Sequence, residues 1–408
     1  MSKPSLLRKI FPPKLIACEL GPNYTRRDAL GWWLNPARPE EYLADFVDLG
    51  GAHYWVDSGR TGLTLLLRSL QMPGERVMLQ GYSCVVVPNA VRAAGMRPVV
   101  VDVEPNGFNL DLDVVEAQAQ AGVRVLIVQH TYGIPVDMDR LMRIVKEYNL
   151  ILIEDMAHAL GNRWRGRLLG TFGYGAVYSF GRDKVVSSGT GGLVVLHEKA
   201  GEKSLGVEYN RLPAMSGLRV FRQLYYLVMV TLLVRPLYHW QIGKALLFVS
   251  QKLALIGPVF TEEEKTGTAT LPRASRYSPL LKKLLVSQLR RLSTVQSHRL
   301  GLVTRYNAAF GTAYEQPLLR YPLVLTPEQS LRVRQALRRG GILVGTWYRE
   351  VFIPTATAAR ELGITEADLP SVRRLLESGV LNLPTHTNAT GRDARKILEI
   401  VEDTIDSN

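Results

Sequence analysis

The segment VRVLIVQHTYGIPVDMDRLMRIVKEYNLILIEDM, residues 123–156, decides the fold. It begins with an apolar run at 123–130 and ends with a second one at 150–156. Between them, at 138–148, apolar residues recur at helical spacing. Continuous apolar strands that alternate with helices are typical of a parallel sheet buried on both faces. The segment therefore predicts a strand, a helix and a second strand of such a sheet.

The same alternation extends outward from this segment in both directions. Further helices are expected at 61–70 and 112–119, and further strands at 76–79, 97–103, 175–180 and 191–197. The sequence thus predicts an α/β fold with a mostly parallel sheet over about residues 50–200. In such sheets ligands bind at the carboxyl ends of the strands.

The composition limits the classes of protein that need to be considered. The chain has 408 residues, 46% of them hydrophobic and 21% charged, which predicts a folded protein of two or three structural units. Its net charge of +13 would attract nucleic acid, an anionic membrane or phosphorylated small molecules. No zinc-finger spacing, arginine-rich tract or recognition-helix motif is found, so nucleic acid is not predicted as a partner. With only Cys18 and Cys84, no metal site is predicted and a cytoplasmic setting is favoured.

The chain divides into four predicted parts. Residues 1–49 form an N-terminal arm, whose prolines interrupt its apolar residues before a signal peptide could form. Residues 50–200 form the large domain, and residues 201–275 an apolar-rich insertion. Residues 276–408 form a helix over 279–310 and a small α+β domain. In that domain, strands are expected near 320–325 and 341–345, and helices near 327–339, 367–377 and 391–404.

The insertion contains two apolar runs, LYYLVMVTLLV at 224–234 and ALLFVSQKLALIGPVF at 245–260. Each run is shorter than a helix that spans a bilayer, so no transmembrane segment is predicted. Interfacial helices on a membrane and buried helices at a subunit interface both stay open. Packing in the core or between subunits is the preferred interpretation, and any membrane contact through 220–260 is expected to be peripheral.

Two residues point to a cofactor. Asp155 closes the strand at 150–156, and Lys184 follows the strand at 175–180 in the loop SFGRDK, just before the glycine-rich SSGTGG. Alone, the lysine would be a surface charge and the aspartate a helix cap. Together they meet the requirements of a pyridoxal phosphate site, in which a lysine forms a Schiff base and an aspartate pairs with the pyridinium nitrogen.

The segment DSGRTG at 57–62 precedes the predicted helix at 61–70. By itself it is only a turn and a helix cap. In combination with Asp155 and Lys184 it offers backbone amides at a helix N-terminus, hydroxyl groups and an arginine, which are suited to the phosphate of the cofactor.

The chain resembles the DegT/StrS-type sugar aminotransferase family. The resemblance rests on SGRTG at 58–62, IEDMAHALGNRW at 153–164, YSFGRDKVVSSGTGG at 178–192 and VLNLPTH at 380–386. It is close over 50–196 and looser over 276–408. It implies a fold-type-I pyridoxal-phosphate enzyme, with a seven-stranded-type sheet in the large domain, a smaller C-terminal domain and a homodimeric assembly.

The resemblance also implies roles for single residues. Lys184 would bind the cofactor and, once freed, move the proton, while Asp155 would hold the pyridinium nitrogen. His158 would lie near the phenolic oxygen of the cofactor. The phosphate would be bound by four residues, namely Ser179, Gly59, Arg60 and Thr61.

Two positions depart from the family pattern. Cys84 stands where many members have an aromatic residue that stacks on the cofactor ring, with Tyr82 two positions earlier, and which of the two faces the ring stays open. The partner-subunit asparagine of an NxR pattern is missing at 274–276, where the chain reads ASR, although Asn210 precedes an arginine further upstream.

The resemblance implies transamination, from glutamate to a nucleotide-linked keto sugar, in amino-sugar biosynthesis for a surface polysaccharide or a secondary metabolite. One alternative is the dehydratase branch of the family, in which histidine replaces the cofactor lysine, so Lys184 argues against it. The other alternative is a non-catalytic cofactor-binding scaffold at a membrane surface. The retention of Lys184, Asp155 and Ser179 argues against that alternative.

Overall fold

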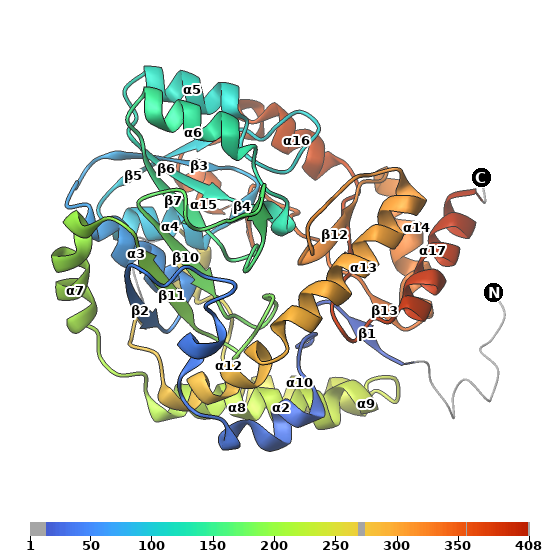
Figure 1. The fold of residues 1–408 in the computed structure, drawn as a ribbon. Helices are drawn as coiled ribbons and strands as arrows, with labels where there is room; N and C mark the ends of the chain where they lie inside the picture. Colours follow the sequence, from blue (N-terminus) through green and yellow to red (C-terminus); the bar gives the residue numbers. More distant parts are fainter. Residues whose placement is uncertain (1–13, 268–273, 356, 407–408) are drawn as a thin grey trace.

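The computed structural model describes residues 14–267, 274–355 and 357–406 (Figure 1). Its centre is a seven-stranded sheet in the order β2-β11-β10-β7-β6-β3-β5. All pairings are parallel except those of β11, which runs antiparallel to β2 and β10. The strands are β2 (Ala52–Val56), β3 (Arg76–Gln80), β5 (Arg97–Val101), β6 (Val125–Gln129), β7 (Ile151–Asp155), β10 (Gly175–Ser179) and β11 (Gly192–Leu196). The predicted mostly parallel α/β sheet is confirmed.

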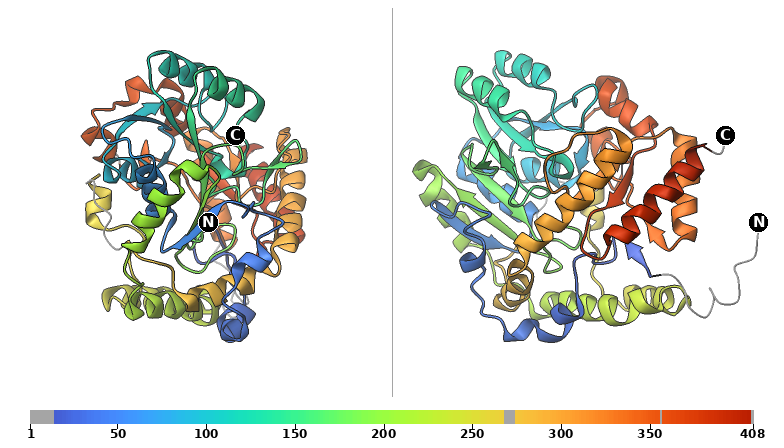
Figure 2. Two further views of the ribbon diagram at one scale, coloured as in Figure 1. Left: turned by 60° about the vertical axis from the view of Figure 1, so that its left-hand side comes forward. Right: turned by 45° about the vertical axis from the view of Figure 1, so that its right-hand side comes forward.

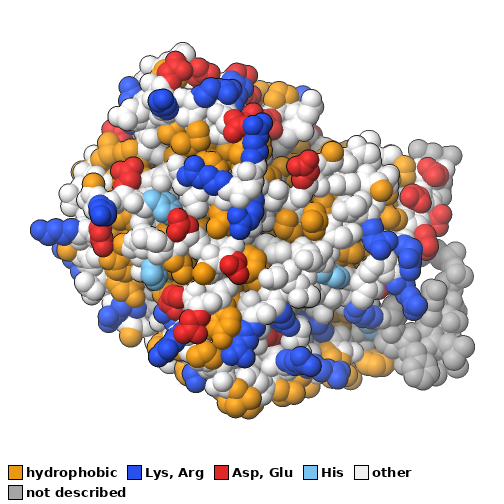
Figure 3. Space-filling model, in the orientation of Figure 1, with side chains coloured by type: hydrophobic (Ala, Val, Ile, Leu, Met, Phe, Trp, Pro, Cys, Tyr) orange, Lys and Arg blue, Asp and Glu red, His pale blue; other side chains and the backbone are white. Residues whose placement is uncertain are grey.

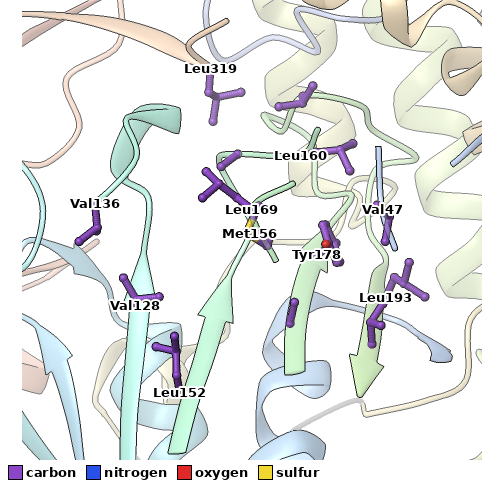
Figure 4. Packing of buried hydrophobic residues seen from close by; sticks show 14 of the residues in the cluster. Val47, Val128, Val136, Leu152, Met156, Leu160, Leu169, Tyr178, Leu193 and Leu319 are labelled. Carbon is purple, nitrogen blue, oxygen red and sulfur yellow. The ribbon is translucent and has the colours of Figure 1, made fainter. Parts of the chain in front are cut away.

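Both faces of this sheet are covered by helices. Leu126 and Val128 of β6 pack with α5 (Leu112–Gln120) and α6 (Met138–Glu147) in one core cluster. Val125 and Ile127 of the same strand pack on the other side with α3 (Gly59–Ser69) and α4 (Val86–Ala93). Because successive strand residues point to opposite faces, an unbroken apolar run serves both clusters. Figure 4 shows one of them, with Val128, Leu152, Tyr178 and Leu193 side by side on neighbouring strands.

The C-terminal part forms a smaller unit beside the sheet (Figure 2). Within it, β12 (Arg320–Leu323) pairs antiparallel with β15 (Leu381–Pro384), and three helices share one apolar cluster with them. The helices are α13 (Leu292–Phe310), α14 (Pro327–Arg339) and α17 (Gly391–Asp406). The single helix predicted over 279–310 is wrong in one respect, because the chain bends at residues 290–291 and divides it into α12 (Pro279–Leu289) and α13.

Short elements complete the two units. Strand β4 (Ser83–Cys84) pairs with β14 (Phe352–Ile353), and β8 (Arg163–Trp164) with β9 (Arg167–Leu168). The remaining helices of these units are α7 (Glu202–Asn210), α15 (Thr357–Glu361) and α16 (Pro370–Glu377).

The predicted N-terminal arm is folded onto the body from residue 14 onward, and its residues 1–13 lie outside the described part. Strand β1 (Ile16–Ala17) pairs with β13 (Ile342–Leu343) of the small unit. Tyr24 is fully buried, and its hydroxyl lies 2.9 Å from the Ser187 hydroxyl. Helix α2 (Arg26–Gly31) then begins with a capping box formed by Thr25 and Asp28. This segment is therefore no free linker, because burial and hydrogen bonds hold it in place.

After α7, the insertion continues with α8 (Gly217–Met229), which runs through a π-helical turn, η5 (Val230–Val234), into α9 (Arg235–Leu237). The resulting helix of 21 residues, with a mean hydropathy of 1.4, is long and apolar enough to cross a membrane by length and composition alone. The prediction that this part is too short to span a bilayer is therefore wrong. The helix continues past the charged residues on either side of the apolar run. About 39% of its most apolar window is buried inside the protein. Helices α10 (Ile242–Lys252) and α11 (Glu262–Lys265) follow, and residues 268–273 of the insertion lie outside the described part.

Candidate active site

The candidate site lies at the carboxyl ends of β7 and β10. Strand β7 ends with two acidic residues, whose side chains point to opposite faces of the sheet. The fully buried Glu154 accepts hydrogen bonds from the amides of Gly170 (2.7 Å) and Phe172 (2.6 Å), and so has a structural role. The charge of Asp155 acts on Lys184, which lies in the loop after β10.

Asp155 and Lys184 act on each other electrostatically. Burial raises the pKa of Asp155, while the amide of Ala157, at 3.0 Å, and the charge of Lys184 oppose this shift. Burial lowers the pKa of Lys184, and Asp155 opposes that shift. A lysine with a lowered pKa is more often neutral, which is the form that attacks an aldehyde.

His158 lies at the same edge and is neutral. Burial lowers its pKa well below the usual value, and the charges of Lys184 and Arg320 act in the same direction. Its Nδ1 accepts a hydrogen bond from the Tyr132 amide at 3.2 Å. In a neutral imidazole this leaves the proton on Nε2, so His158 is suited to donate to an oxygen of a ligand.

The N-terminus of α3 meets the end of β10. A Cβ added to Gly59 would lie 3.1 Å from the Cβ of Ser179, so any other residue would require the two elements to shift by a few tenths of an ångström. The first amides of α3, at Gly59 and Arg60, have no acceptor within the helix, and the helix dipole makes this end positive. Together with the Ser179 hydroxyl they could bind a phosphate.

Two of the predicted phosphate ligands are already engaged. The Thr61 amide donates to the capping hydroxyl of Ser58 at 3.2 Å, which leaves Thr61 only its own hydroxyl for a ligand. The Arg60 guanidinium forms an ion pair with the buried Glu264 at 2.5 Å and donates to the Val259 carbonyl at 3.4 Å. The side chain of Arg60 is therefore directed toward the insertion, and its role at the phosphate stays a prediction.

Of the two candidates for the ring-stacking position, Cys84 borders the site. Its thiol pKa is raised by burial, and the charges of Lys184, Arg60 and Asp155 act on it. Tyr82, in contrast, is fully buried, and its hydroxyl accepts from the amide of Tyr348 at 3.0 Å. Tyr82 therefore belongs to the core, and the position of Cys84 at the cofactor ring stays a prediction.

The sequence reasoning missed an aromatic and an arginine that the small unit brings to the site. The Trp347 ring stacks on His158 with a centroid distance of 5.4 Å, and Lys184 Nζ lies 5.5 Å from its centroid. On the same ring lies the guanidinium of Arg320, at 3.6 Å, although Arg320 is only 3% exposed. Arg320 also opposes the burial that raises the pKa of Asp183 to about 6.

Of the residues considered for the missing asparagine, Ser275 and Arg276 run beside the end of β2, where the Asp57 amide donates to the Ser275 carbonyl at 3.0 Å. Asn210 ends α7, and Arg211 pairs with Glu208 at 2.7 Å. Arg276 is exposed, and its amide donates to the Pro213 carbonyl at 2.8 Å. Over residues 14–267, 274–355 and 357–406, no group of three or more metal-ligating side chains is found.

The chain has the fold-type-I architecture, which it shares with a putative sugar aminotransferase from Streptococcus pneumoniae in its PMP form. The TM-score is 0.69 at 18% identity, and the match covers 96% of this chain and 97% of the other. Residues 26–208, a little under half of the chain, match the DegT/DnrJ/EryC1/StrS aminotransferase family.

Curated relatives match only part of the chain. A GDP-perosamine synthase from Caulobacter vibrioides is 32% identical over 161 residues, which make up 39% of this chain and 43% of that protein. A dTDP-4-dehydro-2,6-dideoxy-D-glucose 3-dehydratase from Saccharopolyspora spinosa is 36% identical over 170 residues, or 40% of this chain and 37% of that one. The chain thus matches less than half the length of these relatives, and the two differ in the reaction that they are named for.

The residues present fit pyridoxal phosphate. The site offers a lysine of lowered pKa, a carboxylate held at the strand end, a neutral histidine donor and a helix N-terminus beside a serine. These are the groups that the aldehyde, the ring nitrogen, the phenolic oxygen and the phosphate of the cofactor require.

Proposed function

We propose that the protein is a pyridoxal-phosphate-dependent aminotransferase, which moves an amino group from glutamate to a nucleotide-linked keto sugar. The observation that carries the proposal is the coupling of Asp155 and Lys184 at the edge of the sheet, beside the N-terminus of α3. When bound, the cofactor supplies an electron sink that stabilises negative charge on the substrate carbon.

Each residue of the site would have a separate role in this reaction. Lys184 Nζ binds the cofactor and, once an amino substrate has displaced it, moves a proton to and from the reacting carbon. Asp155 keeps the ring nitrogen protonated, and His158 Nε2 donates to the phenolic oxygen. Ser179 and the first amides of α3 bind the phosphate and so fix the orientation of the ring toward Lys184.

We further propose a homodimer in the cytoplasm, with any membrane contact limited to the periphery. The dimer rests on the family resemblance alone, since the asparagine of the partner-subunit pattern is replaced by Ala274 in this chain. The dehydratase is the second candidate, because a relative named for that reaction is 36% identical over 170 residues. Lys184 favours the aminotransferase, since it provides the amine that the dehydratase branch lacks.

The test is an absorption spectrum of the purified chain with pyridoxal phosphate, before and after glutamate is added. We expect a visible band of the lysine-bound cofactor that glutamate converts to the band of the aminated cofactor. Lys184→Ala should abolish the first band, whereas Lys203→Ala, an exposed lysine on α7, should keep it. A bound cofactor that no amino donor converts would reject the aminotransferase.

A further inference from the structure

The insertion has an unusual distribution of charge. Residues 212–260 contain no aspartate or glutamate, whereas the whole chain has 37 of them in 408 residues. The same stretch contains two lysines and three arginines. Of these, Arg219 is paired with Asp57 and Arg235 donates to two backbone carbonyls of the N-terminal segment. Lys252 is exposed and Lys244 is partly exposed, so both can meet a ligand.

Exposed apolar side chains gather on the same part of the molecule. Of the eighteen large hydrophobic side chains that the described residues expose, ten belong to residues 217–259 of the insertion. They are Leu218, Phe221, Val228, Leu233, Trp240, Ile242, Phe248, Val249, Leu253 and Val259. Single exposed hydrophobics are ordinary on a protein surface, but a concentration of this kind marks an interaction site.

The N-terminal segment extends this surface. Helix α2 packs against α8 and η5, and it exposes Arg26, Arg27 and Leu30, followed by Trp33 and Leu34, the latter 79% exposed. We call α2 to Leu34 together with residues 217–259 the insertion face. Figure 3 shows its margin along the lower edge, where hydrophobic side chains lie beside lysine and arginine side chains.

The helices of the insertion face lie along the protein surface. Tyr226, Leu227, Val230 and Val234 pack inward in one cluster with Tyr24. Figures 1 and 2 show α8 and α10 stretched along the same side of the molecule as α2. With one apolar flank buried and another exposed beside basic residues, these helices have the character of interfacial helices.

The charge decides between a membrane and a second copy of this chain. In a two-fold symmetric dimer each patch would face itself, so its cations would be brought together without acids to neutralise them. An anionic bilayer instead offers phosphate groups to the lysines and arginines, and an apolar layer beneath them to the phenylalanines and leucines. Lys252 Nζ lies 5.7 Å from the ring centroid of Phe248, so the two kinds of group are already side by side.

We propose that the insertion face binds the surface of a bilayer that contains anionic lipids, with α8 and α10 lying in the plane of the interface. This inference goes beyond the aminotransferase activity and does not depend on it. Its position matters for the site, because Arg182, two residues before Lys184, donates to the Gly257 carbonyl at 3.1 Å and lies 4.1 Å from the Tyr226 ring. Binding to a bilayer would therefore place the cofactor loop next to the membrane surface.

The test is flotation of the full chain with vesicles of phosphatidylcholine, with and without phosphatidylglycerol. We expect binding to the anionic vesicles only, and weaker binding as salt is added, because salt screens the attraction. The pair Lys244→Gln and Lys252→Gln should lower the partition coefficient about 25-fold, at about fivefold for each cation. The pair Phe221→Ser and Phe248→Ser should lower it at least about tenfold, because the apolar contribution is lost.

Matched controls lie on α14 and just before it, in the small unit. Arg338→Gln with Arg339→Gln, and Val324→Ser with Leu331→Ser, change exposed residues of the same kinds and should leave vesicle binding unchanged. Circular dichroism checks that all variants fold.

Equal binding to both vesicle types, no binding to either, or equal loss in the controls would overturn the proposal. Sedimentation velocity tests whether the insertion face instead binds a second copy of the chain. That would be the conclusion if the parent were a dimer that did not bind vesicles, and if this dimer dissociated only in the Phe221→Ser, Phe248→Ser variant.

Discussion

Lys184 and Trp347, which belong to different units of the chain, lie together at the candidate site, with 5.5 Å between Lys184 Nζ and the centroid of the indole ring. The other neighbours of the ring are His158 and the guanidinium of Arg320. The ring therefore contacts side chains of both units, and it links the small unit to the cofactor loop.

Trp347→Ala should weaken binding of pyridoxal phosphate. The change removes the stack of the indole on His158, worth about 1 kcal/mol, and that stack holds the imidazole in place for the cofactor. The Kd should therefore rise by up to about fivefold, while Trp347→Phe should keep most of the affinity. Titration of the cofactor followed by absorption measures this. An unchanged Kd in Trp347→Ala would mean that the ring supports the fold but not the cofactor.

The two acidic residues that end β7 should respond in opposite ways to the loss of charge. Glu154→Gln should lower the free energy of unfolding by about 1–3 kcal/mol, because the buried acceptor of several backbone amides is weakened. Asp155→Asn should have a small effect on stability but lower kcat at least about 100-fold, since the ring nitrogen loses its partner. Urea unfolding and steady-state assays on both variants separate the roles. If Asp155→Asn kept full activity, the assignment of Asp155 would be wrong.

The pH dependence of cofactor capture should report the pKa of Lys184. Because burial lowers this pKa, the rate of binding should reach half its maximum at a pH below the usual lysine range. Asp155 raises the same pKa, so in Asp155→Asn the half-maximum should move to a still lower pH. Stopped-flow absorption measures the rate. A shift to higher pH would contradict the coupling of the two residues.

Much of this arrangement follows from local sequence. Strands such as β6 were predicted because a sheet covered on both faces needs an unbroken apolar run, and Asp155 and Lys184 because each stands at the end of such a run. Strand β2 was missed, since it contains His53 and Tyr54 and is partly exposed at the sheet edge.

The residues of the small unit could not be placed in the same way. Trp347 and Arg320 meet Lys184 only through the packing of the two units, which no local pattern describes. The sequence did contain one indication of this contact. Arg320 is the first residue of the short strand RYPL, and the whole strand is buried. A cation within a buried strand needs an acidic or aromatic partner, and here Trp347 and Asp183 provide it.

His158 should make stability depend on pH. Its pKa in the folded protein is lowered well below the usual value of about 6.5, so between these values the unfolded chain binds a proton that the folded chain does not. As the pH falls below about 6.5, His158 should therefore lower the free energy of unfolding by up to about 1.4 kcal/mol per pH unit. His158→Gln should remove that contribution and flatten the profile. Urea unfolding at pH 5.5 and 7.5 measures the difference, and parallel profiles of the parent and the variant would show that the pKa of His158 is the same in the folded and unfolded chain.

Gly59 tests the phosphate site without touching an ionisable group. In Gly59→Ala the new methyl group would lie 3.1 Å from the Ser179 Cβ, so the helix end and the strand end must move apart. We expect the Kd for pyridoxal phosphate to rise about tenfold, because the first amides of α3 and the Ser179 hydroxyl no longer converge on one anion. The control is Gly301→Ala in α13, where an added Cβ meets nothing within 4 Å and should increase helix stability. Pyridoxal, which lacks the phosphate, should bind equally to the parent and to Gly59→Ala. If it too were weakened tenfold, the substitution would have disturbed the site as a whole, and the placement of the phosphate at α3 would lose its support.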